Sequence, residues 1–233
     1  MGLTHPPFCW DLGPREQHVA GILGQAGYET HLFGFQHVTT RLDRLGFHTA
    51  PTACAESGDG NALGCTVAQQ VADFLGKPMS NRPLYMEVNL EEPHRPFDQG
   101  GAVPDDGKGV FVPSYLPDDS ASREEMAALQ GAIRQADAAV GKILALVDGA
   151  GLRKNTLVVL MADHGIAMPR AKCTLYDSGI EVALIVRWPE AGLDSGRVYS
   201  EMVSNLDVLP TMLENTPPDP LFGAERARTA QSL

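Results

Sequence analysis

The chain has 233 residues, of which 43% are hydrophobic and 20% charged, a composition typical of a folded globular protein. Its 29 acidic residues outnumber the 18 basic ones, which gives a formal net charge of −11. This charge argues against nucleic acid and anionic membranes as partners, because both attract lysine- and arginine-rich surfaces. An anionic small substrate would need a locally positive pocket or a metal ion.

Several classes of segment are missing from the sequence. No apolar run approaches the ~20 residues that cross a membrane. The first ten residues lack the charged-then-apolar pattern of a signal peptide, so the compartment stays unassigned. The four cysteines, at positions 9, 54, 65 and 173, form no CxxC pair, which argues against a zinc ribbon and favours free thiols.

Helices and short apolar strands are expected to alternate along the chain. Hydrophobic residues recur at helical spacing over 16–26, 66–75 and 122–150. A short helix is also expected over 207–213. Apolar runs predict strands over 29–33, 84–90, 156–162 and 182–186. A capping box, Ser122-x-x-Glu125, predicts the start of the longest helix. This alternation indicates an α/β fold with a mostly parallel sheet flanked by helices.

The remaining segments are expected to be loops. Residues 38–64 include a turn cluster at 56–61, interpreted as a solvated loop, and residues 98–119 are rich in glycine, proline and aspartate. No convincing pattern follows Asn215. The predicted organisation is one domain over residues 1–214 and an irregular tail over 215–233.

Ionisable residues follow the apolar run Leu157–Met161, which has the length of a buried strand. Asp163 and His164 come directly after it, and Lys172 follows before the next apolar run. Ligands bind beyond the carboxyl ends of strands in open α/β sheets. A carboxylate and an imidazole at the end of a buried strand are also costly unless a partner satisfies them. A metal or substrate site is therefore expected here, with a simple turn cap as the alternative for Asp163.

Five segments together resemble the sulfatase family of the alkaline phosphatase superfamily. In chain order they are AGYETHLFGFQH (26–37), NLEEPHRPF (89–97), NTLVVLMADHG (155–165), AKCTLYDSGIEVALIVRWPE (171–190) and LDVLPT (206–211). The resemblance covers about residues 16 to 213. It implies an alkaline-phosphatase-like fold and hydrolysis of sulfate esters or N-sulfates of a small molecule or saccharide. It also implies a calcium ion and a formylglycine nucleophile made from a cysteine in a C-x-P/A-S-R motif.

The resemblance implies a role for each matching residue. Asp163 and His164 occupy metal-site positions, where many sulfatases have asparagine in place of His164. Lys172 and His94 resemble the residues that contact the substrate sulfate, and His37 resembles the histidine near the leaving group. Two ligands are too few for calcium, so weak or no calcium binding by this chain is expected.

Some family features are absent from the sequence. Phe35 replaces the lysine of Gly-Lys-x-His, and Cys173 stands where glycine is usual. None of the four cysteines lies in a C-x-P/A-S-R motif, and the family's early aspartate pair is missing. These absences indicate an N-terminally truncated sulfatase domain, without a nucleophile and with little or no turnover.

Two alternatives remain open. The chain could be a non-catalytic protein that binds sulfated sugars through His94 and Lys172. It could instead be a phosphatase or phosphodiesterase of the same superfamily, which would bind zinc. The segment AKCTLYDSG favours the sulfatase interpretation.

Overall fold

The computed structural model describes residues 12–13, 15–50 and 63–215, with no side-chain description for 63–66. The chain divides into two compact units. The first comprises Met1–Ala55, Met79–Asn89 and Val198–Leu233, and the second comprises Glu56–Pro78 and Leu90–Arg197. The turn cluster at 56–61 and the tail after Asn215 lie outside the described residues.

The first unit is built on a parallel strand pair. Strand β1 (Glu29–Gly34) pairs with β2 (Leu84–Asn89), in register from Glu29 opposite Leu84 to Gly34 opposite Asn89. Helix α1 (Val19–Gln25) precedes β1 and packs against it, and α5 (Val208–Glu214) lies near the end of the described chain. These elements match the predicted helices and strands to within a few residues. The parallel pairing is the arrangement that the alternating pattern predicts.

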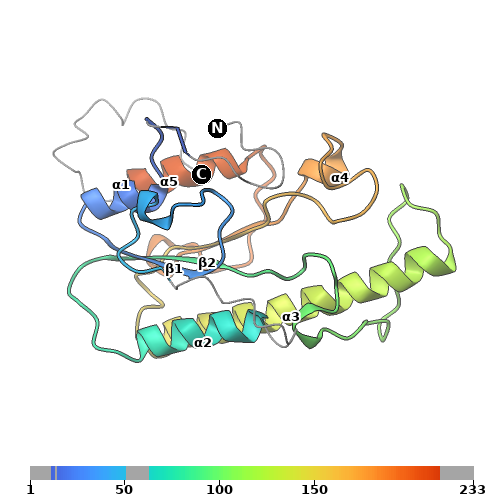
Figure 1. Cartoon of the computed structure of the whole chain (residues 1–233), viewed down its shortest axis with the longest axis horizontal. Coiled ribbons are helices and arrows are strands. Elements are labelled where there is room, and N and C mark those ends of the chain that lie inside the picture. Colours follow the sequence, from blue (N-terminus) through green and yellow to red (C-terminus); the bar gives the residue numbers. More distant parts are fainter. Residues whose placement is uncertain (1–11, 14, 51–62, 216–233) are drawn as a thin grey trace. The chain divides into compact units, whose positions relative to one another are not determined.

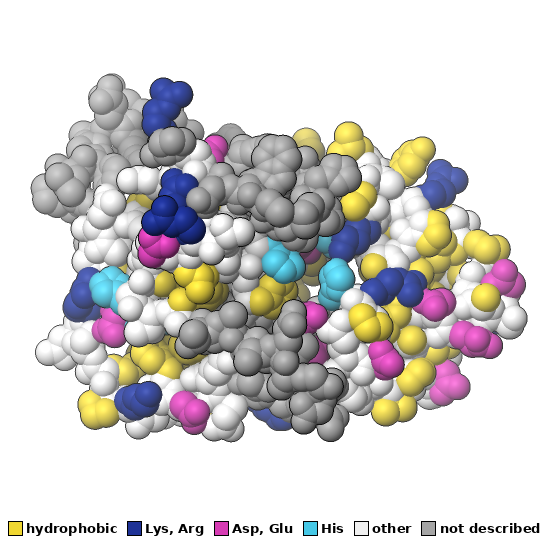
Figure 2. All heavy atoms as spheres, viewed as in Figure 1, with side chains coloured by type: hydrophobic (Ala, Val, Ile, Leu, Met, Phe, Trp, Pro, Cys, Tyr) yellow, Lys and Arg dark blue, Asp and Glu magenta, His cyan; other side chains and the backbone are white. Residues whose placement is uncertain are grey.

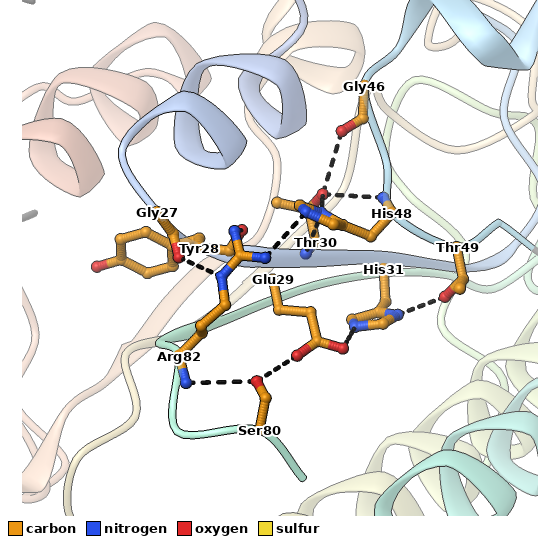
Figure 3. A network of polar contacts seen from close by, with 10 residues as sticks. All are labelled: Gly27, Tyr28, Glu29, Thr30, His31, Gly46, His48, Thr49, Ser80 and Arg82. Atoms are coloured by element: carbon orange, nitrogen blue, oxygen red, sulfur yellow. Dashed lines mark hydrogen bonds and ion pairs between the residues drawn. The ribbon is translucent and has the colours of Figure 1, made fainter.

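A polar network surrounds β1 (Figure 3). The buried ring of His31 contacts the hydroxyl of Thr49 through Nδ1, and its Nε2 lies 3.0 Å from Oε1 of Glu29. Ser80 donates to the other oxygen of Glu29. Burial lowers the pKa of His31 below its usual 6.5, partly opposed by the Glu29 carboxylate. The buried His31 ring therefore has a partner at each ring nitrogen.

The arginine of this network ties loop carbonyls together. The Arg82 guanidinium donates to the carbonyls of Gly27 and Tyr28, each at 2.8 Å (Figure 3). The hydroxyl of Thr30, which is fully buried, lies 2.9 Å from Nδ1 of His48. The first unit therefore satisfies its buried polar groups with neighbouring side chains and main chain, as burial requires.

The second unit combines two long helices with a two-stranded sheet. Helix α2 (Leu63–Leu75) lies beside α3 (Ser120–Gly149) (Figure 1). Strand β3 (Val158–Met161) and strand β4 (Leu184–Arg187) follow, separated by the short helix α4 (Asp177–Ile180), which the sequence patterns did not predict. No helix in the described part of the chain is long and apolar enough to span a membrane.

A cluster of buried side chains forms the core between α3 and two loops. It consists of Phe97, Met126, Leu129, Ala132 and Met168. Met126, Leu129 and Ala132 are spaced three apart, so they lie on one face of α3. Phe97 and Met168 come from loops far apart in the sequence. The loop that carries His94 and the loop before Lys172 are therefore anchored on the same helix face.

The strands of the second unit differ from the prediction in two ways. They pair antiparallel, with Leu160 opposite Ile185, whereas a mostly parallel sheet was expected. They are also not buried: Leu160 is 40% exposed and Ile185 is 59% exposed. An apolar run indicates strand formation, but burial also needs a second layer, and a strand pair alone provides none. Figure 2 shows hydrophobic side chains at the surface among charged ones.

The start of α3 also differs from the prediction. Its N-cap is Asp119, whose carboxylate accepts from the backbone N–H of Ser122 at 2.8 Å. The predicted capping box is therefore wrong, because the helix begins two residues earlier. Glu125 is instead free to pair with Arg95, with 2.6 Å between Oε2 and a guanidinium nitrogen.

Candidate sulfate-binding site

Lys172 and His94 come together although they lie far apart in the sequence. Nζ of Lys172 is 3.2 Å from Nε2 of His94. Lys172 is half-buried and His94 is exposed, so both reach solvent. An ammonium group and an imidazole that converge at the surface form a small site with the polarity that attracts an anion. This is the locally positive site that an anionic substrate of an acidic chain would need.

The orientation of the His94 ring is set by its own loop. Its Nδ1 lies 2.6 Å from the carbonyl oxygen of Arg95, so Nδ1 must carry the proton that is donated. Nε2 then has a lone pair, which accepts from the Lys172 ammonium. The backbone N–H of His94 also donates to the carbonyl of Glu91 at 2.8 Å. The ring is thereby held with Nε2 directed at Lys172.

Lys172 is held by close main-chain packing around the Asp-His-Gly segment. Its backbone N–H donates to the carbonyl of Ile166 at 3.0 Å, and Gly165 donates to the carbonyl of Gly179 at 2.9 Å. A Cβ added at Gly165 would lie 1.9 Å from the carbonyl oxygen of Ser178. Only glycine fits this approach, which gives a physical reason for the glycine of the motif.

Cys173 follows Lys172 with a backbone φ of +66°, in the left-handed region that favours glycine. This explains why glycine would suit the position. The thiol is free and exposed, as expected of this cysteine.

Asp163 and His164 contact each other but do not form a metal site in the described structure. Nε2 of His164 lies 3.4 Å from Oδ2 of Asp163, while its Nδ1 is 2.8 Å from the carbonyl of Gly165. The Asp163 side chain is 85% exposed. The expectation that Asp163 lies at the end of a buried strand is therefore wrong. No group of three metal-ligating side chains occurs among the described residues. Calcium takes six to eight oxygen ligands, so these two residues alone do not complete a calcium site.

His37 belongs to the first unit, whereas His94, Lys172, Asp163 and His164 belong to the second. Its ring lies 5.1 Å from that of Phe35, centroid to centroid, just beyond β1. Asn89, at the end of β2, donates to the carbonyl of Phe35 at 2.7 Å. The segment around His37 is thus held at the carboxyl end of the parallel pair. Its role near a leaving group remains a prediction.

A profile of the sulfatase family matches residues 1–217. The chain belongs to the sulfatase family. The suspected resemblance is thereby confirmed. Family membership implies a metal ion and formylglycine in general terms.

Individual relatives agree with this assignment. The chain is 30% identical over 219 residues to human N-sulphoglucosamine sulphohydrolase, covering 83% of this chain and 43% of that protein. It is 35% identical over 228 residues to rat steryl-sulfatase, covering 91% of this chain and 35% of that protein. The chain therefore spans less than half the length of these curated relatives.

Solved structures show the same fold. One, in complex with its substrate D-glucosamine-2-N,6-O-disulfate, superposes with a TM-score of 0.70 at 15% identity, covering 88% of this chain and 61% of that one. A 2-O glycosaminoglycan sulfatase superposes with a TM-score of 0.68 at 20% identity, covering 99% of this chain and 58% of that one. At these identities the likeness establishes the alkaline-phosphatase-like α/β fold, and the expected fold class is confirmed.

Proposed function

We propose that this chain contributes the sulfate-recognising part of a sulfatase, and that Lys172 and His94 bind the sulfate group of a sulfated saccharide or other small sulfate ester. The observation that carries the proposal is the 3.2 Å approach of Nζ of Lys172 to Nε2 of His94. Family membership gives the class of ligand. A saccharide is favoured because the human relative and the substrate-bound structure are named for N-sulfated glucosamine compounds.

The Lys172 ammonium is the donor that this pair offers to a sulfate. Sulfate oxygens only accept hydrogen bonds, and an ammonium has three N–H donors. One of them is directed at Nε2 of His94, whose Nδ1 donates to the Arg95 carbonyl. The His94 ring therefore holds the ammonium in place, and the ammonium can also donate to a bound sulfate.

The proposal is limited to recognition. The 233 residues contain no cysteine in the C-x-P/A-S-R motif, so the covalent chemistry of the family is not assigned to a residue of this chain. Asp163 and His164 stay proposed metal-site residues that need further ligands. His37 stays a proposed leaving-group residue.

Titration calorimetry with inorganic sulfate tests the proposal. Saturable binding is expected. Lys172→Met should weaken binding at least about tenfold, because a charge-assisted contact is worth ~1.5–3 kcal/mol. Lys108→Met is the matched control, since it removes the same charge from an exposed loop of the same unit.

Two results would contradict the assignment. Equal affinity in Lys172→Met and Lys108→Met would show that sulfate binds elsewhere. A marked preference for inorganic phosphate over sulfate, together with bound zinc, would favour the phosphatase alternative. Saturable binding of a sulfated sugar without product would leave recognition intact and favour the non-catalytic binding protein.

A further inference from the structure

The side chain of Arg95 links the His94 loop to the turn that carries Lys172. Its Nε donates to the carbonyl of Ala167 at 3.0 Å, and a terminal nitrogen lies 3.5 Å from Sδ of Met168. The carbonyl of Ile166, the preceding residue, accepts from the backbone N–H of Lys172. Arg95 therefore binds the turn at Ala167, next to the Ile166 carbonyl that accepts from Lys172.

The guanidinium is held from other sides as well. It lies 4.4 Å from the centre of the Phe97 ring, and a terminal nitrogen lies 2.6 Å from Oε2 of Glu125 on α3. Phe97 and Met168 are both anchored in the buried cluster on α3. A planar, forked cation can stack on a ring and donate along its edges at once, which a lysine ammonium cannot.

The main chain of Arg95 acts on the other half of the pair. Its carbonyl accepts from Nδ1 of His94 at 2.6 Å and from Nε2 of Gln99 at 3.1 Å. One residue thus orients the imidazole through its carbonyl and fixes the Lys172 turn through its side chain.

We propose that Arg95 is the positioning residue of the sulfate site, holding the His94 loop against the Lys172 turn so that Nε2 and Nζ converge on one anion. The sulfate itself rests on the proposed function; the convergence of the two side chains does not. Arg95 acts through its neighbours, because its charge is paired with Glu125 and its donors are directed at protein atoms.

The test uses the full chain with Arg95→Ala and Arg95→Lys. Arg123→Ala serves as the control, since Arg123 is an exposed arginine on α3 that pairs with Asp118. The first measurement is the tautomer of the His94 ring by ¹⁵N NMR without sulfate. The second is the dissociation constant for inorganic sulfate at fixed pH and ionic strength. Thermal melting identifies any variant that fails to fold.

The parent and Arg123→Ala should both carry the His94 proton on Nδ1. Arg95→Ala keeps the carbonyl that accepts from Nδ1 but removes the side-chain contacts to the Lys172 turn. With Lys172 no longer held at Nε2, the proton population should shift toward Nε2, and sulfate affinity should fall about tenfold, the lower end of what losing an orienting partner costs. Arg95→Lys keeps the charge but loses the planar guanidinium, so its sulfate affinity should fall nearly as far. If Arg95→Ala is unfolded, Arg95→Lys and Glu125→Gln give the same two readouts.

Failure of this inference is distinct from failure of the proposed function. An unchanged tautomer and unchanged sulfate affinity in the folded Arg95 variants would overturn the positioning role. A parent chain that binds no sulfate would overturn the proposed function, while the tautomer would still decide whether Arg95 orients His94. A general loss of stability without a tautomer change would mark Arg95 as structural only and would also overturn the inference.

Discussion

The two strand pairs of this chain treat their ionisable neighbours in opposite ways. Around β1 and β2, His31 is buried and its two ring nitrogens contact Thr49 and Glu29. Beyond β3, Asp163 is 85% exposed and His164 is 37% exposed, with their mutual contact at 3.4 Å. Both regions hold a histidine beside a carboxylate, but only the first buries its histidine.

The difference lies in what each region orders. In the first region the side chains are held by hydrogen bonds, because buried polar groups such as the His31 ring need partners. The second orders main chain: Gly165 packs directly against the backbone of Ser178, and the side chains beside it face solvent. An ordered backbone with exposed ionisable groups suits a place where a ligand completes the coordination or the hydrogen bonds.

The largest effect is expected from disturbing the backbone contact of the second region. Gly165→Ala would place Cβ 1.9 Å from the carbonyl oxygen of Ser178, which is main chain and cannot rotate away. We expect a loss of about 2–3 kcal/mol in the free energy of unfolding. Urea denaturation measures it. Gly141→Ala on α3 is the control, since its Cβ would meet nothing within 4 Å and should stabilise the helix by ~1 kcal/mol. A loss as small as that of an exposed substitution would mean that the close packing at Gly165 is not what orders this loop.

The burial of histidines in the first region should make the free energy of unfolding depend on pH. Burial lowers the pKa of both His31 and His18 below 6.5. As the pH falls below about 6.5, the unfolded chain therefore binds more protons than the folded one, and the free energy of unfolding decreases. Each histidine can contribute a slope of at most about 1.4 kcal/mol per pH unit.

Denaturation at pH 7 and at pH 5.5 measures this slope, above the range in which carboxylates titrate. His31→Gln should flatten the pH dependence, because it removes one of the two histidines whose pKa burial lowers. Equal slopes in the parent and His31→Gln would show that the buried ring does not resist protonation, and the contrast between the regions would be lost.

The smallest effect concerns a residue of the Lys172 turn whose backbone conformation suits glycine better than its own side chain. Cys173 has a φ of +66°. Cys173→Gly should raise the free energy of unfolding by about 0.5–1 kcal/mol, because the strain of a Cβ in the left-handed region exceeds the added entropy of glycine. Cys173→Ala separates strain from thiol chemistry, since it keeps the Cβ. An equal gain in both variants would place the effect at sulfur.

Much of the secondary structure could be predicted from the sequence. Periodicity located α1, α2, α3 and α5, and short apolar runs located all four strands, because these signals depend on local spacing. Only the family motifs indicated that His94 and Lys172 both belong to the site. The two residues lie 78 positions apart, so local sequence patterns do not predict their contact.

What sequence could not give depends on tertiary contacts. Burial of β3 was wrongly expected, because hydrophobicity reports a tendency and not the presence of a covering layer. The Ser122–Glu125 pattern predicts a cap, whereas Asp119 caps α3 and Glu125 pairs with Arg95. Arg95 was missed although it stands inside the recognised Pro-His-Arg-Pro-Phe segment. An arginine beside a motif histidine gives no sign that its carbonyl and guanidinium serve different partners.

The exposed cross-strand pair of Leu160 and Ile185 affects how copies of the chain behave in solution. Apolar side chains on a strand pair attract one another, and the attraction strengthens on warming. The net charge of −11 opposes it by mutual repulsion, but only over a Debye length. The tendency of the chain to self-associate therefore depends on buffer and temperature. Dilute, cool buffers favour separate molecules, and concentrated salt favours association through the exposed Leu160 and Ile185 side chains.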